Sequence, residues 1–282
     1  MKLLFAVAIL ISFISVDRDF RYMCDYKANH DTLVVMLETA FPGREKAEVC
    51  WRLARASLMM GEQAQTKEEK REHFNRGIEW AEKGLEEDSS SKECYMWHCA
   101  NVGRKCQTYS IMDQAAAVPV MTKDLTAILD RFGNTEYSEA WQALSELFYH
   151  HPFKSKESAI NYARKAAVCI PAGELRISTY TYLAQILYER GWSARKRMAA
   201  AAENGVEFKK QHDSNIQKYS YFDGAQTYMP WSIKPFVQMS DKEEAALIVS
   251  YAKGLYNSSK DLTPVDKKDY KALEEFSGKM KQ

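Results

Sequence analysis

The sequence predicts an all-α protein built from antiparallel helical hairpins, and three observations support this fold class. The chain of 282 residues has 12 glycines and only 7 prolines, a composition that suits helices better than a sandwich of strands and turns. Apolar residues between positions 47 and 91 recur with the period of a helix, in two successive runs. Small residues interrupt both runs at the positions where two packed helices would touch.

These two runs predict the first hairpin in detail. Their order is a large residue near position 4, Leu-Ala at 7 and 8, Gly at 15 and small residues at 20, 24 and 27, which is the tetratricopeptide pattern. The sequence therefore predicts a tetratricopeptide-like α-solenoid of stacked antiparallel helical hairpins. The small residues at the predicted helix contact are Ala54, Gly77, Ala81 and Gly84.

The chain before this hairpin contains an apolar segment and a predicted pair of short helices. Residues 1–16 hold a lysine followed by an apolar run too short to cross a bilayer comfortably. They resemble a signal peptide or an N-terminal anchor, although no Ala-x-Ala cleavage site precedes Asp17, and a soluble start stays open. Residues 20–38 predict two helices separated by a break at Asn29-His30-Asp31.

The connection between the two helices of the hairpin is longer than in a standard repeat by about 11 residues. Thr66 and Glu69 have the spacing of a capping box, so the second helix is expected to start at Thr66 and to run for extra turns. This extension carries alternating charges from Lys67 to Glu72. It reads as a solvated helix face, or alternatively as a docking surface for a partner.

Three of these features together resemble the regulator of microtubule dynamics family. They are Trp-Arg-Leu-Ala-Arg-Ala-Ser at 51–57, the charged extension of the second helix, and Cys-x-x-Trp at 94–97. The resemblance covers about residues 31–202 and the C-terminal helix. It implies a degenerate tetratricopeptide-like domain in a scaffold protein that is associated with microtubules or an organelle membrane and is active in dividing cells.

Residues 125–137 depart from the family pattern, because they are too few for the helix expected there, which is either lost or merged. The pattern returns at residues 156–171, and residues 175–191 then predict a first repeat helix whose partner is 193–203. The predicted domain organisation is thus a tetratricopeptide-like domain over 17–203, after the signal or anchor at 1–16. An aromatic-rich insertion over 204–262 is expected to pack on the solenoid, and a helix over 263–282 to close the chain.

The side chains that carry chemistry give no enzyme signature. The six histidines lack the spacing of a zinc hydrolase, and no phosphate-binding glycine loop or nucleophile elbow occurs. Cys94, Cys99 and Cys106 match no zinc pattern, and Cys50 and Cys169 lie on apolar stripes, where reduced thiols are expected. We expect no catalytic residues, no metal site and no cofactor. The net charge of +1 argues against a nucleic-acid partner.

The remaining class of function is binding of a protein partner in a concave helical groove. The resemblance implies that this partner is tubulin or microtubules. Arg52 and Arg55 are the preferred pair for an acidic partner such as the acidic tail of tubulin. The expected location is the cytoplasm, on microtubules or the spindle. The expected groove residues lie off the buried stripes of the inner helices: Arg52, Arg55, Met59, Trp97, Asn101, Arg104, Gln185 and Tyr188.

A second class of function stays open at this point. In this alternative the protein is secreted or membrane-anchored through residues 1–16 and binds a lipid or other hydrophobic ligand. Its cavity would be built from Trp141, Phe148, Trp231 and Phe236. The sequon at Asn257 would report passage through the secretory pathway if it were glycosylated.

Overall fold

The computed structural model describes residues 13–109, 111–150, 154–221 and 228–281, apart from the side chains of 111–115. Within these ranges the regular structure is helical, and the β-type pairing is an isolated bridge between Tyr228 and Pro235. The all-α prediction is confirmed. Contacts divide the chain into two compact units, Met1–Ile128 and Leu129–Gln282, which are described separately below.

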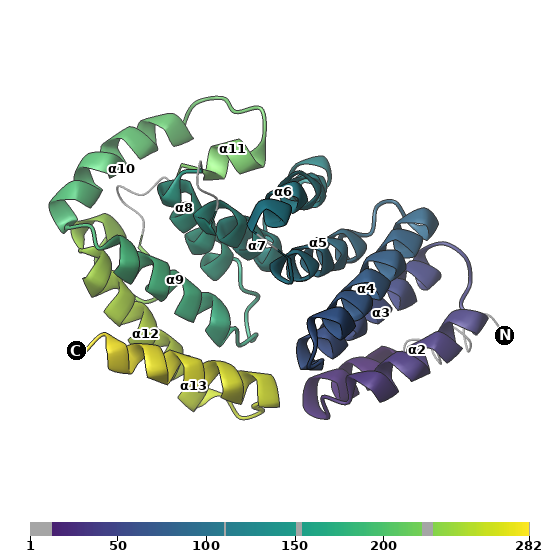
Figure 1. Ribbon diagram of the computed structural model, residues 1–282. Helices are drawn as coiled ribbons and strands as arrows, with labels where there is room; N and C mark the ends of the chain where they lie inside the picture. Colours follow the sequence, from purple (N-terminus) through teal and green to yellow (C-terminus); the bar gives the residue numbers. More distant parts are fainter. Residues whose placement is uncertain (1–12, 110, 151–153, 222–227, 282) are drawn as a thin grey trace. The chain divides into compact units, whose positions relative to one another are not determined.

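The first unit is a succession of helices in which each packs on its neighbour in sequence. It opens with a helical segment over residues 13–22. The pairs α2 with α3, α3 with α4, α4 with α5, and α5 with α6 are in contact, as Figure 1 shows for α3 and α4. The helices are α2 (Tyr26–Thr39), α3 (Arg44–Gln63), α4 (Lys67–Glu87), α5 (Lys92–Gln107) and α6 (Ile111–Thr126).

The hairpin of α3 and α4 forms as the sequence predicts, and its small residues are the reason the helices approach closely. Ala54 and Ala81 are fully buried at this contact. A β-carbon added to Gly77 would overlap the side-chain amide of Asn101, and one added to Gly84 would overlap the sulfur of Cys94. These two glycines therefore allow α5 to lie directly against α4.

The start of α4 is set by local sequence, as expected. Thr66 accepts a hydrogen bond from the backbone N–H of Glu69, and the Glu69 carboxylate accepts one from the backbone N–H of Thr66. This reciprocal pair satisfies two of the amide donors that a helix N-terminus leaves free.

The predicted break at Asn29-His30-Asp31 is wrong, because α2 runs through these residues without interruption. The chain breaks earlier, at Met23–Asp25, where Cys24 has a φ of 53° and the Asp25 carboxylate caps α2. The side chain of Asn29 is buried and donates to the carbonyl of Val16, which ties α2 to the preceding helical segment. Asn29, which the sequence pattern predicts to lie in a turn, is therefore a helical residue whose side chain makes a tertiary hydrogen bond.

Between the two units the helical chain continues from α6 into a π-helical turn, Ala127–Arg131. The next helix begins only at Ser138. The helical continuation ends at Arg131, so the segment 125–137 contains no separate repeat helix.

The second unit is organised around α9 (Ile177–Arg190). This helix packs on α8 (Lys156–Val168), α12 (Asp241–Ser258) and α13 (Pro264–Lys279), while α8 also packs on α7 (Ser138–His150). The remaining elements are α10 (Ala194–Phe208), α11 (Asn215–Tyr219) and the 3₁₀ turn η2 (Phe236–Gln238). The predicted helix over 241–255 and the Thr263-capped closing helix are both present.

One expectation for this unit is wrong. The helix over 175–191 takes α12 as its principal partner, followed by α8 and α13, instead of 193–203, and α10 packs mainly on η2. The predicted boundary at residue 203 falls inside α10, which continues through Asn204 and Gly205 to Phe208. The reason for the partners of α9 is long-range packing: Ile248 and Leu273 are fully buried in the core beside α9, to which α10 contributes only Ala201 among the described buried residues.

The aromatic residues considered for a ligand cavity lie in two clusters. Trp141 and Phe148 pack on the ring of Tyr162, with centroid distances of 5.6 and 5.2 Å. Trp231 instead packs against Tyr180 and belongs, with Phe236, to the buried core around α9. The four side chains therefore act as parts of two packed cores.

Candidate functional site

The preferred arginine pair lies on α3, one turn apart, and faces the helical segment 13–22. Arg52 and Arg55 are 7% and 8% exposed. The carboxylate of Asp17 accepts hydrogen bonds from Nη2 of Arg52 at 2.9 Å and from Nη2 of Arg55 at 2.6 Å. Nη1 of Arg52 also donates to the carboxylate of Glu48, one turn earlier, at 2.8 Å. Both guanidinium groups are therefore already paired within the chain.

Aromatic rings enclose these charges. The guanidinium of Arg52 lies 4.3 Å from the ring centroid of Phe13 and 4.0 Å from that of Trp51. The guanidinium of Arg55 lies 3.8 Å from the ring of Phe20. Cation–π contacts of this kind gain strength when the cation is shielded from water. The segment 13–22 thus supplies both the carboxylate and part of the aromatic wall.

Burial and neighbouring charges shift the pKa values of the groups in this site in opposite directions. Burial alone would raise the pKa of Asp17, but the hydrogen bonds and positive charges of Arg52 and Arg55 outweigh burial and lower the pKa. For Arg55, burial lowers the pKa despite the charge of Asp17. Nε of Arg55 is buried and has no hydrogen-bond partner among the described residues.

These contacts correct the expected exposure of the pair. The sequence pattern places both arginines off the buried stripe, facing a groove, whereas the structure buries them under the segment 13–22. Little in the sequence indicates this contact, because Asp17 is 35 residues from Arg52 and lies next to an apolar run that resembles a targeting segment. The useful signal is the helical spacing of Phe13, Asp17 and Phe20, which puts them on one helix face.

Asn101 also has a structural role instead of the expected groove position. It is fully buried, and its side-chain amide donates to the carbonyls of Ala54 at 3.2 Å and Trp97 at 2.7 Å. It thereby ties α5 to α3 across the space left by Gly77. Its predicted position off the buried stripe is wrong because α5 packs on both α3 and α4.

The other expected groove residues differ in exposure. Met59 and Trp97 are partly buried, whereas Arg104 is exposed and pairs with Glu62 at 3.2 Å. Gln185 and Tyr188 lie on α9 in the second unit, where the ring of Tyr188 packs edge-on against Phe276. The structure therefore brings Arg52 and Arg55 into one site, and places Gln185 and Tyr188 in another unit.

A buried histidine–aspartate pair links α5 to α6 in the first unit. Nδ1 of His98 lies 2.6 Å from the carboxylate of Asp124, and its Nε2 lies 3.7 Å from Glu82. Burial alone would lower the pKa of His98, but the hydrogen bond and charge of Asp124 outweigh it and raise the pKa. The pair holds two helices together with a charge-assisted hydrogen bond.

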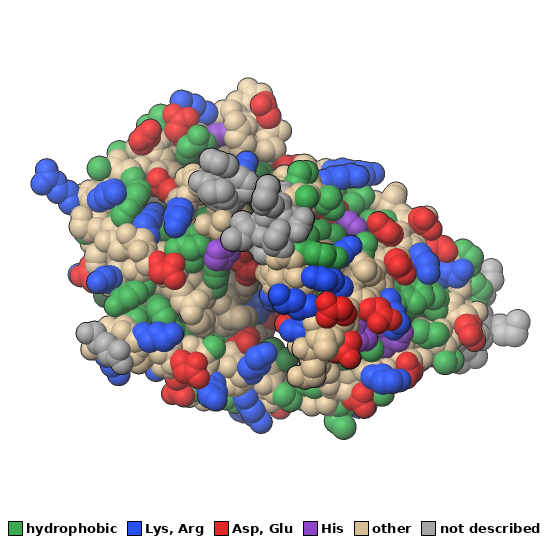
Figure 2. All heavy atoms as spheres, in the orientation of Figure 1, with side chains coloured by type: hydrophobic (Ala, Val, Ile, Leu, Met, Phe, Trp, Pro, Cys, Tyr) green, Lys and Arg blue, Asp and Glu red, His purple; other side chains and the backbone are tan. Residues whose placement is uncertain are grey.

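Three further observations bear on function. In the residues that the structure describes, no group of three or more His, Cys, Asp or Glu side chains is placed to hold a metal ion. No helix in the described ranges is long and apolar enough to span a membrane. Acidic and basic side chains are mixed over the face shown in Figure 2, as the balanced net charge suggests.

Comparison with known proteins supports the family resemblance over the first unit. The model of the family "Regulator of microtubule dynamics protein 1-3" matches residues 16–126. This range contains the Trp-Arg-Leu-Ala-Arg-Ala-Ser motif, the extended α4 and the site around Asp17. No curated protein matches the chain. The resemblance is therefore shown for a segment that begins within the helical segment 13–22 and ends with α6.

Proposed function

We propose that this chain is a microtubule-associated regulator that works as a non-enzymatic protein-interaction scaffold. The observation that carries the proposal is the family match over residues 16–126, which coincides with one compact helical unit. Stacked helical hairpins present side chains on a shared face and suit the binding of an extended or helical segment. The mixed surface charge favours a local binding site over a general attraction to polyanions.

The site around Asp17 suggests the chemistry of the partner. It already holds one carboxylate between two arginines and aromatic rings. An acidic segment of a partner, such as the tail of tubulin, offers the same carboxylate group. We therefore propose that such a segment binds Arg52 and Arg55 when the segment 13–22 moves away, so that Asp17 acts as an internal competitor.

Microtubule co-pelleting of the purified full-length chain tests both parts of this proposal. We expect the wild-type chain to pellet with microtubules, and to pellet less with microtubules whose acidic tails have been removed by protease. Asp17→Asn should increase the bound fraction at sub-saturating microtubule concentration, because it weakens the internal competitor. Asp19→Asn is the matched control, since Asp19 is half-exposed and pairs only with its neighbour Arg18 among the described contacts.

The possible results of this experiment test microtubule binding and the role of Arg52 and Arg55 separately. Absence of wild-type pelleting would refute microtubule binding. If the wild-type chain pellets but Asp17→Asn and Asp19→Asn behave alike, microtubule binding stands and the role of Arg52 and Arg55 is rejected. In dividing cells, a C-terminal fluorescent tag should mark microtubules or the spindle. The C-terminus is the better place for the tag, because Phe13 and Val16 pack into the core of the first unit.

A further inference from the structure

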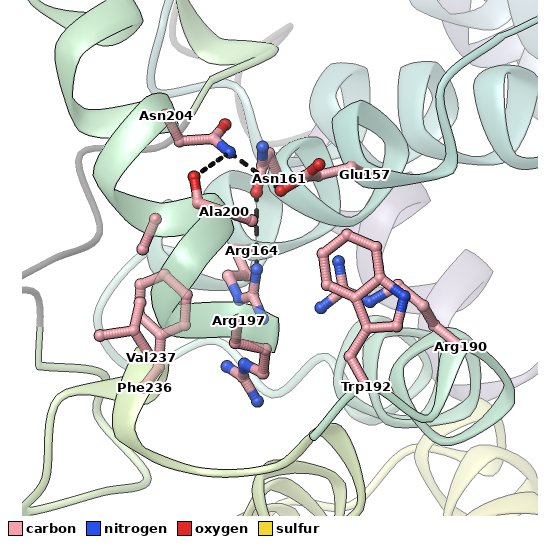
Figure 3. A pocket seen from close by; sticks show the side chains of 11 residues that line it. Glu157, Asn161, Arg164, Arg190, Trp192, Arg197, Ala200, Asn204, Phe236 and Val237 are labelled. Carbon is pink, nitrogen blue, oxygen red and sulfur yellow. Dashed lines mark hydrogen bonds between the residues drawn. The ribbon is translucent and has the colours of Figure 1, made fainter. Parts of the chain in front are cut away.

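The second unit contains a hollow lined by arginines that lies outside the segment matching the family. It is enclosed by α8, α10, the end of α9 and η2, and has about 300 Å³ of empty volume, part of it open to solvent. Figure 3 shows Asn161, Asn204 and Glu157 at one end and the side chains of Arg164 and Arg197 toward the other. Trp192 and Phe236 provide aromatic walls.

Three arginines at this hollow share two carboxylates. Arg190 makes a two-pronged bond to Asp241, with Nε and Nη2 at 2.8 and 2.7 Å from the two carboxylate oxygens. Arg164 and Arg197 both donate to the same oxygen of Glu244, at 2.8 and 2.6 Å. Asp241 and Glu244 are fully buried. Three guanidinium groups against these two carboxylates leave one positive charge without a buried counter-charge.

Arg197 is the least satisfied member of this cluster. It is 3% exposed, and within the described structure its Nε and Nη1 lack hydrogen-bond acceptors. Nη1 lies 3.3 Å from Asp241 as an ion pair, whereas Nε has no such contact. A buried donor without an acceptor costs on the order of 1–3 kcal/mol, more when it is charged. Burial and then the charge of Arg164 lower the pKa of Arg197 to about 10, so the group remains protonated at neutral pH.

Most other hydrogen-bond donors that line the hollow already donate to acceptors within the chain. The Asn204 amide donates to Glu157 and to the carbonyl of Ala200, and the Asn161 amide donates to the carbonyl of Ser220. The indole of Trp192 lies under the guanidinium of Arg190 at 4.1 Å and the ammonium of Lys196 at 4.2 Å. The three buried guanidinium groups thus outnumber the two fully buried carboxylates beside an aromatic surface, and Glu157 is the partly buried carboxylate at the other end of the hollow.

We propose that this hollow binds the phosphate group of a small soluble ligand. Guanidinium groups match the geometry of phosphate oxygens and remain charged when buried. Because the hollow is partly open to solvent, one phosphate oxygen lies inside it, toward the arginines, and the other oxygens face the open part. If the ligand is a phosphate monoester, its organic part lies along Trp192. Free phosphate and a monoester share this chemistry, and the experiment distinguishes them.

The test is isothermal titration calorimetry of the full chain with inorganic phosphate and with phenyl phosphate, at constant ionic strength. We expect saturable binding of phosphate to the wild-type chain. Arg197→Gln should weaken binding at least tenfold, because it removes the unpaired donor and leaves the cluster neutral. Arg195→Gln is the matched control on the same helix, since Arg195 is exposed and the charge change is identical. This control should bind like the wild type.

A second variant, Glu157→Gln, tests whether removing a negative charge from the hollow raises its affinity for phosphate. Glu157 is a partly buried carboxylate at the hollow, and Glu157→Gln should tighten phosphate binding by lowering repulsion of the anion. Tighter binding of phenyl phosphate than of inorganic phosphate identifies a monoester ligand, and equal affinities identify free phosphate.

The result that overturns the proposal is the absence of saturable binding of both probes to the wild-type chain. Equal affinity in Arg197→Gln, Arg195→Gln and wild type would also overturn it. Far-UV circular dichroism checks the fold of each variant. If Arg197→Gln fails to fold, Arg197→Lys retains the charge beside Glu244 but lacks Nε, and should still weaken phosphate binding.

Discussion

Nη2 of Arg55 lies 2.6 Å from the carboxylate of Asp17, so a residue near the start of the described chain neutralises a buried cation on α3. Arg52 shares the same carboxylate. The arginines that the sequence suggested for an external acidic partner thus have an internal one. The first prediction concerns what happens when this carboxylate is removed.

Asp17→Asn should lower the free energy of unfolding by about 1–3 kcal/mol, because two buried cations lose their shared counter-charge. Urea denaturation followed by circular dichroism measures this loss. Amide hydrogen exchange should show faster exchange in residues 13–22, whose docking depends on the pair. Asp19→Asn, at a half-exposed position, should change stability little. Equal stability of the two variants would mean that the Asp17 pair contributes nothing measurable.

The His98–Asp124 pair predicts a pH dependence with a defined sign. The pKa of His98 is raised in the folded chain above the ordinary histidine value of 6.5. The stability from this pair is therefore fully present below about pH 6.5 and is lost as the pH rises through the raised pKa. His98→Gln should remove this part of the dependence in urea titrations across that range. A wild-type curve parallel to that of His98→Gln would contradict the prediction.

Alanine substitutions at Gly77 and Gly254 should change the stability of the protein in opposite directions. In Gly77→Ala the new methyl group would overlap the side-chain amide of Asn101, and the loss should be about 2 kcal/mol. Gly254 on α12 has no atom within 4 Å of an added β-carbon, so Gly254→Ala should stabilise by up to about 1 kcal/mol through helix propensity. Thermal melts compare the two. Stabilisation by Gly77→Ala would show that α4 and α5 are not in close contact there.

Glu244→Gln should be among the most destabilising single changes in the second unit. It removes the carboxylate that accepts hydrogen bonds from Arg164, from Arg197 and from the indole N–H of Trp231. Removing one partner of a buried ion pair lowers the free energy of unfolding by about 3–5 kcal/mol. Glu203→Gln, on the exposed side of α10, should stay within about 0.5 kcal/mol of wild type. Equal denaturation midpoints for the two variants would contradict the buried network.

Much of the fold could be predicted from the sequence because its causes are local. The period of the apolar residues, the small residues at 54, 77, 81 and 84, and the caps at Thr66 and Thr263 determine the α3–α4 hairpin, the length of α4 and the closing helix. Each cue acts between residues on one helix or on neighbouring helices. The resemblance motif at 51–57 lies in this same locally determined part.

The candidate site was predicted only in part. Sequence alone marked Arg52 and Arg55 as the pair for a carboxylate, but placed that carboxylate on a partner. It also placed Asn101 at a surface, because the closeness of α5 to α3 depends on the absence of a side chain at Gly77.

What the sequence by itself determined is the all-α class, the caps at Thr66 and Thr263 and the close contact of the α3–α4 hairpin, because hydrogen bonding and periodicity act over a few residues. The tertiary structure alone decided that α9 packs on α12 and α13, that Asp17 closes over Arg52 and Arg55, and that Arg197 meets Asp241 and Glu244. These relationships join residues tens of positions apart. Their energies depend on burial and on the distance between charges, which exist only once the helices have packed.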